Sequence, residues 1–255
     1  MTDLATLAGR TMLVTGASSG IGKAIALSAA RAGADVAITY RTNEAGVREV
    51  ERVVRALGRR AAVFRFDVAD EASLRALGPA ARQALGRIDA WVNNAGADIL
   101  TGPGASLSDA QKLDLLLAVD LRGTILTSWQ AAEILGAQEG GGVIINMSWD
   151  HVLTGMAGTN PQMFAAVKGG VLAFSKSLAR SVAPRVRVNV IAPGWIHTSF
   201  GEGLDESSRS EIAASTPMQR WGTPEDVAGA AVFLASPAAT FITGQAILVG
   251  GGVVM

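Results

Sequence analysis

The 255-residue chain contains no cysteine. Disulfide bridges and thiolate metal sites are therefore excluded, and nothing in the sequence requires an oxidising compartment. Tyrosine and histidine are also scarce, with one and two residues. Few side chains of this protein can therefore exchange a proton near neutral pH.

An excess of charge of either sign is also lacking, because 22 Lys and Arg residues balance 22 Asp and Glu residues. Partners such as nucleic acids or anionic membranes select a basic surface, so neither is expected. No apolar run approaches the roughly 20 residues that span a bilayer, and the first ten residues do not resemble a secretory signal. We expect a cytoplasmic protein that acts on a small molecule and has no metal site.

Hydrophobic residues make up 49% of the chain, which is enough to bury a sizeable core. Short apolar runs alternate with longer amphipathic stretches, and this order predicts parallel strands joined by right-handed helical crossovers. We predict one doubly wound α/β domain over residues 1–255, with helices on both faces of the sheet and a substrate lid near residues 198–222. The predicted strands are 11–15, 36–39, 61–66, 88–92, 143–147, 186–191 and 246–249, and the longer helices are 20–31, 44–57, 71–85, 113–135 and 162–182.

A glycine-rich turn follows the first predicted strand and leads directly into a helix. Gly16 permits the tight turn, Gly20 lets the backbone approach a pyrophosphate, and Gly22 lets the helix pack tightly on the sheet. The helix N-terminus then offers N–H groups and a positive dipole to phosphate oxygens. The turn therefore predicts a Rossmann-type dinucleotide site, whose other contacts are Ser18, Ser19 and Ile21.

The end of the second predicted strand indicates which dinucleotide binds. NAD-binding proteins place a carboxylate there for the ribose hydroxyls, whereas this strand ends in Thr39-Tyr40-Arg41 and Asp35 lies at its opposite end. A guanidinium at Arg41 suits a 2′-phosphate. The sequence therefore favours NADP(H) over NAD(H); the alternative is that Arg41 is a solvated surface residue.

Five segments in the same order resemble the short-chain dehydrogenase/reductase family along nearly the whole chain. They are Thr15–Gly22, the pair Asp67-Val68, Asn93–Gly96, Asn189–Ile196 and the tail from Thr223 to Gly252. The resemblance implies that Asp67 and Val68 contact adenine and that Lys168 binds the nicotinamide ribose. It also implies a homotetramer or dimer formed through the long helices, and further cofactor contacts at Asn94, Ala95, Gly96, Pro193, Gly194 and Ile196.

The same resemblance exposes three departures at the family's catalytic positions. In the family, Tyr and Lys are spaced as YxxxK, and here Phe164 precedes Lys168 at that spacing. Trp149 stands where the catalytic Ser is expected, and Asp120 where an Asn is expected. The single tyrosine, Tyr40, lies on the adenosine side of the predicted fold, so no phenol is expected beside the nicotinamide.

Two segments near these positions carry groups that can replace the missing acid. His151, with its neighbour Asp150, follows the strand that ends near the expected substrate, and imidazole carries protons near neutral pH; otherwise it is a surface loop residue. Asp120 either orients a donor or forms a buried ion pair with Lys168. Three functions remain open: an NADP(H)-dependent oxidoreductase with a rebuilt site, a catalytically silent NADP(H)-binding member of the family, or a non-redox isomerase or cyclase.

Overall fold

The computed structural model describes residues 6–255, and of residues 200 and 202 it describes only the backbone. The described chain forms one seven-stranded sheet in the order β3-β2-β1-β4-β5-β6-β7, in which every neighbouring pair is parallel. The predicted doubly wound α/β fold is therefore confirmed. The strands are β1 (Thr11–Val14), β2 (Asp35–Tyr40), β3 (Ala61–Arg65), β4 (Ala90–Asn93), β5 (Gly142–Met147), β6 (Val186–Pro193) and β7 (Ala246–Val249).

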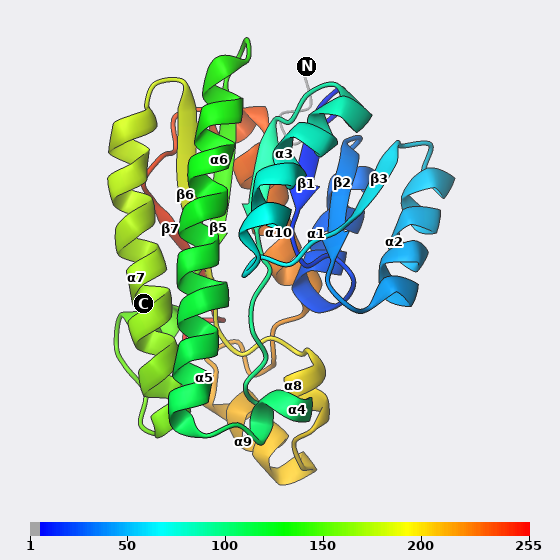
Figure 1. Ribbon diagram of the computed structural model, residues 1–255. Helices are drawn as coiled ribbons and strands as arrows, with labels where there is room; N and C mark the ends of the chain where they lie inside the picture. The colour runs from blue at the N-terminus through cyan, green and yellow to red at the C-terminus, as the bar shows by residue number, and fades with distance from the viewer. Residues whose placement is uncertain (1–5) are drawn as a thin grey trace.

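Helices cover both faces of this sheet (Figure 1). One layer contains α1 (Gly20–Arg31), α2 (Glu44–Ala56) and α10 (Pro224–Ala235). The other contains α3 (Glu71–Leu85), α6 (Gly123–Ala137) and α7 (Thr159–Val182). The remaining helical segments are α4 (Gly102–Ala105), α5 (Asp109–Leu116), η1 (Leu117–Arg122), η2 (Asp150–Val152), α8 (Ser199–Glu202), α9 (Glu206–Ser215) and η3 (Pro237–Ala239). No helix within residues 6–255 is both long and apolar enough to cross a membrane.

Successive strand residues enter different hydrophobic cores because side chains alternate between the two faces of a sheet. In β1, Met12 and Val14 pack toward α1 and α10, whereas Leu13 packs toward α3 and α6. In β4, Val92 belongs to the first core and the fully buried Trp91 to the second. Both faces of the central strands are covered, as expected for parallel sheets.

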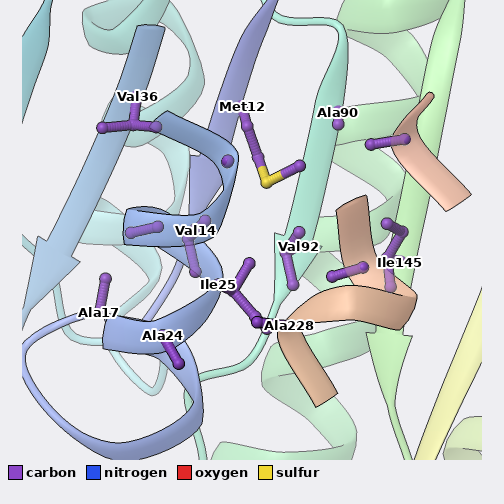
Figure 2. Packing of buried hydrophobic residues seen from close by; sticks show 14 of the residues in the cluster. Met12, Val14, Ala17, Ala24, Ile25, Val36, Ala90, Val92, Ile145 and Ala228 are labelled. Atoms are coloured by element: carbon purple, nitrogen blue, oxygen red, sulfur yellow. The ribbon is translucent and has the colours of Figure 1, made fainter. Parts of the chain in front are cut away.

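Small side chains let α1 and α10 pack closely against each other under the sheet. Ile25 of α1 lies beside Ala228 of α10 in this core, and Ala24 belongs to the same cluster (Figure 2). Ala228 is completely buried. Helix α10 begins with a capping box: the Thr223 side chain accepts a hydrogen bond from the N–H of Asp226, and the Asp226 side chain accepts one from the N–H of Thr223.

The region predicted as a single helix over 113–135 is in fact three segments. Ser108 and Gln111 form a capping box that starts α5 at Asp109, ahead of the predicted start. The chain then widens into the π-helical η1 before α6 continues. Such π segments often occur at functional sites, and Asp120 lies inside this one.

The strand order places a crevice between β1 and β4. From β1 the successive strands are added toward one edge of the sheet, and from β4 they are added toward the other edge. Ligands of open α/β sheets bind at this switch point, outside the carboxyl ends of the strands. Helices α4, α8 and α9 lie beyond that edge of the sheet (Figure 1). The fold therefore predicts the functional site at this edge.

Close packing between α1 and α10 makes a stability prediction. Replacing Ala228 with Leu adds volume to a filled core, and we expect the free energy of unfolding to fall by about 1–3 kcal/mol. The neighbouring Gly229→Ala is the matched control, because a Cβ there meets open space. It should stabilise α10 by about 0.5–1 kcal/mol. Urea unfolding followed by circular dichroism measures both changes, and an unchanged midpoint in Ala228→Leu would contradict the packing.

Candidate active site

A cavity of about 830 Å³ opens at the carboxyl edge of the sheet. Its lining runs from the glycine-rich turn after β1 and the ends of β2 and β3 to residues that follow β4, β5 and β6. The cavity therefore spans both halves of the fold across the switch point. A dinucleotide, with two nucleoside ends joined by a pyrophosphate, needs a site of this extent.

The geometry of the glycine-rich turn fits a pyrophosphate. Gly16 and Gly20 adopt φ angles of +66° and +52°, which favour glycine. A methyl group on Gly22 would lie 2.2 Å from the carbonyl oxygen of Gly16, so α1 approaches the turn too closely for any side chain. Within the described chain the Ser19 side chain makes no capping bond to α1, and the first turn has no acidic residue. The N–H groups there remain available to an anion.

Asn94 fixes the turn to the other half of the fold. Its Nδ2 donates to the carbonyl oxygens of Thr15 (3.0 Å) and Gly16 (3.1 Å). The Thr15 hydroxyl oxygen accepts from the backbone N–H groups of Asn94 and Ala95. These bonds hold β1 and β4 together at the crevice, so the cavity floor is ordered before any ligand binds.

The end of the cavity nearest β2, where adenosine is expected, contains Arg41, followed by Thr42 and Asn43. Arg41 is exposed and faces the cavity, whereas Asp35 lies at the far end of β2 in an ion pair with Arg60. The predicted separation of these two residues is thus confirmed. Asp67 also lines this end, where its Oδ1 accepts from the N–H of Ala69.

A buried ion pair occupies the opposite end of the cavity. The Lys168 ammonium lies 2.7 Å from Asp120 Oδ1, and the two side chains are 12% and 2% exposed. Asp120 Oδ2 accepts from the N–H of Ala97 at 2.8 Å. Of the two interpretations of Asp120, the ion pair with Lys168 is the one that the structure contains.

Aromatic rings surround this ion pair. Trp149 and Phe164 both line the cavity, with their ring centroids 6.2 Å apart in an edge-on arrangement. Ser148 lines it too, but its hydroxyl donates to the carbonyl oxygen of Lys168 at 2.8 Å. Trp195 extends the aromatic lining from the segment after β6.

His151 and Asp150 form a second buried pair next to the cavity. His151 Nδ1 lies 2.6 Å from Asp150 Oδ1, and the imidazole stacks on Trp149 with centroids 4.9 Å apart. His151 is 9% exposed, so it is not a surface loop residue. Neither residue is among the described residues that line the cavity. Asp150 Oδ2 has no hydrogen-bond partner within the described chain and sits against Gly194 and Gly250.

Most residues predicted from the sequence therefore meet in one cavity, although their roles stay predictions. Gly20 borders the turn without being a lining residue, and a Cβ on it would lie 3.7 Å from Thr198. Asp98 lines the cavity, but its carboxylate accepts from the backbone of the following loop. His197 is exposed outside it. The sequence analysis did not single out several other lining residues. Four of them carry no motif signal: Leu100, Met156, Asn160 and Pro161. Trp195 lies inside the segment Asn189–Ile196, and Thr198 and Ser199 lie inside the predicted lid.

Comparison with known proteins agrees with this architecture. Residues 16–254 match the family model described as enoyl-(acyl carrier protein) reductase. The L-rhamnose 1-dehydrogenase (NAD(P)(+)) of Sphingomonas sp. is 36% identical over 251 residues, which cover 96% of each chain.

Two solved structures extend the likeness to three dimensions. A 7α-hydroxysteroid dehydrogenase complexed with NADH and 7-oxo glycochenodeoxycholic acid is 31% identical with a TM-score of 0.89, covering 100% of this chain and 98% of that one. A short-chain type dehydrogenase/reductase from Mycobacterium marinum is 30% identical, also with a TM-score of 0.89, covering 98% of each chain. The chain belongs to the short-chain dehydrogenase/reductase family.

Proposed function

We propose that this protein is an NADP(H)-dependent oxidoreductase with a rebuilt proton-transfer site. The observation that carries the proposal is the single cavity, which joins a phosphate-binding turn to the Lys168–Asp120 ion pair. Relatives with the same fold are dehydrogenases, and one of them is solved with NADH. When bound, the nicotinamide supplies or accepts a hydride.

Different residues of this chain bind the different parts of the dinucleotide. The turn around Gly16 and the N-terminus of α1 receive the pyrophosphate. Arg41 pairs with the 2′-phosphate. An NAD-binding site would have a carboxylate at the end of β2, whereas the described carboxylate that lines this end of the cavity, Asp67, follows β3. Lys168 reaches the nicotinamide ribose, and Asp120 fixes the position of its ammonium group.

The substrate end differs from the pattern that the family resemblance implies. Phe164 has no exchangeable proton, and Trp149 has an indole N–H in place of a serine hydroxyl. We propose that residues 198–222, which include α8 and α9, form the substrate lid. We also propose a homo-oligomer through α5, η1, α6 and α7; the first three carry the exposed apolar side chains Leu113, Leu117 and Trp129, respectively.

The absence of an unpaired acid among the described lining residues also favours a second candidate, an NADP(H)-binding protein without turnover.

A binding and turnover assay separates the two candidates. If the protein is an oxidoreductase, purified protein should bind NADPH and oxidise it in the presence of at least one member of a carbonyl, imine and enone panel. Tryptophan-to-NADPH energy transfer measures binding, and absorbance at the nicotinamide band measures oxidation. Binding without oxidation across the panel supports the silent candidate, and no binding contradicts both.

The role of Arg41 predicts a change in cofactor preference. Arg41→Gln removes a charge-assisted hydrogen bond to the 2′-phosphate, so we expect NADPH affinity to fall by about 10- to 100-fold. Affinity for NADH, which lacks that phosphate, should stay within about 3-fold. Arg52→Gln is the matched control, because Arg52 is exposed on α2 and does not line the cavity. Equal losses for NADPH and NADH would contradict the assignment.

Phe164 and Trp149 stand where the family has Tyr and Ser, so restoring those two residues should increase ketone reduction. The double variant Phe164→Tyr with Trp149→Ser places a phenol one helical turn before Lys168. It also places a serine hydroxyl at the position of Trp149, which lines the same cavity. A positioned acid contributes about 10²–10⁴-fold, so reduction of simple ketones should rise by about 100-fold or more. The control is Phe164→Leu with Trp149→Ser, which opens the same space without a phenol. Equal ketone rates in the two double variants would show that the acid was not what the site lacked.

A further inference from the structure

The substrate end of the cavity has a wall of aromatic rings. Trp149 meets the edge of Phe164 at 6.2 Å, and His151 stacks on Trp149 at 4.9 Å with 23° between the planes. His151 in turn meets Trp195 edge-on at 6.1 Å. Trp149, Phe164 and Trp195 face the cavity, and the Asp150–His151 pair holds Trp149 in place from a buried position.

The charges at this end favour a cation. Among the described residues that line the cavity, the cationic side chains are Arg41, at the adenosine end, and Lys168, which is paired with Asp120. Asp98 adds a further carboxylate to the lining. The faces of aromatic rings carry negative partial charge and attract cations. An anionic substrate would meet no free positive group among these residues.

The supply of protons at this end is poor. Neither histidine lines the cavity within the described chain, and Tyr40 lies at the end of β2 on the adenosine side. The Ser148 hydroxyl is committed to the carbonyl oxygen of Lys168. If Lys168 gave up its proton, Asp120, which is 2% exposed, would be left as a buried charge without its partner. A ketone, whose reduction produces an alkoxide, is therefore a poor match for this site.

We propose that the substrate is a cyclic iminium cation bound against the wall formed by Trp149, Phe164 and Trp195; this rests on the proposed function. The C=N⁺ carbon gains the hydride that a reduced nicotinamide dinucleotide supplies. The π electron pair moves to nitrogen as its lone pair, and the dinucleotide leaves oxidised. Charge and atoms balance without uptake of a proton, so the site needs no acid. An N-alkylated iminium gives a tertiary amine that is neutral as it forms, and the aromatic wall holds this neutral amine less strongly than the cation. The amine takes up a proton only after it reaches water.

Binding tests the recognition step independently of turnover. The probe is N,N-dimethyl-tetrahydroisoquinolinium, a permanent cation without a reducible bond, titrated calorimetrically into the NADPH complex. Trp149→Leu keeps apolar volume but removes a π face, so affinity for this probe should fall by about 3- to 30-fold. Affinity for neutral tetralone should change by less than about 2-fold. Trp149→Phe should restore most of the cation affinity.

The matched control is Phe241→Leu. Phe241 is fully exposed and precedes β7, at the edge of the sheet opposite the cavity. Both affinities should be unchanged in this variant, and NADPH affinity reports that each variant is folded. Equal effects of Trp149→Leu on the cation and on tetralone would overturn the proposal.

Turnover separates this inference from the proposed function. N-methyl-dihydroisoquinolinium and tetralone share a ring system, and rates are corrected for the reaction without protein. We expect kcat/KM for the iminium to exceed that for tetralone by about 100-fold or more. If tetralone is reduced equally well or better, the iminium inference is overturned and the oxidoreductase stands. If NADPH binds but neither compound is reduced and the cation does not bind, the iminium inference is overturned, and NADPH oxidation across the carbonyl, imine and enone panel decides whether the oxidoreductase stands.

Discussion

The ion pair between Lys168 and Asp120 is the constraint on which the rest of the site depends. It joins α7 to the π-helical η1, and Asp120 also accepts from the N–H of Ala97 beyond β4. With one charge of each sign buried together, neither side chain can give or take a proton without leaving its partner uncompensated. The pair therefore fixes the position of Lys168 and limits its use as an acid.

The two halves of the cavity follow different physical rules. At the glycine-rich turn, backbone N–H groups and the α1 dipole offer binding to any pyrophosphate, and Gly22 cannot carry a side chain. At the other end, side chains decide the chemistry, and there Trp149 and Phe164 provide ring faces instead of hydroxyl groups. Intact cofactor geometry is thus compatible with a changed reaction, since fold and function are separable.

Much of this arrangement could be predicted from the sequence because it rests on local signals. Alternating strands and helices predicted the doubly wound fold, and the glycines after the first strand predicted the turn that borders the cavity. The π segment around Asp120 could not be predicted, because continuous helical periodicity conceals one widened turn. Leu100, Met156 and Asn160 carry no motif, and only tertiary structure brings them to the cavity. The burial of His151 beside Trp149 is likewise a tertiary contact.

Isotope transfer tests the central claim, direct hydride transfer from the dinucleotide to the iminium carbon, most directly. N-methyl-dihydroisoquinolinium is reduced with NADPH that carries two deuterium atoms at the nicotinamide C4, and the amine is analysed by mass spectrometry. The account predicts one deuterium on the carbon of the former C=N⁺ bond, and no carbon-bound deuterium when ordinary NADPH is used in heavy water. An unlabelled product from deuterated NADPH, or carbon-bound label taken from the solvent, would contradict it.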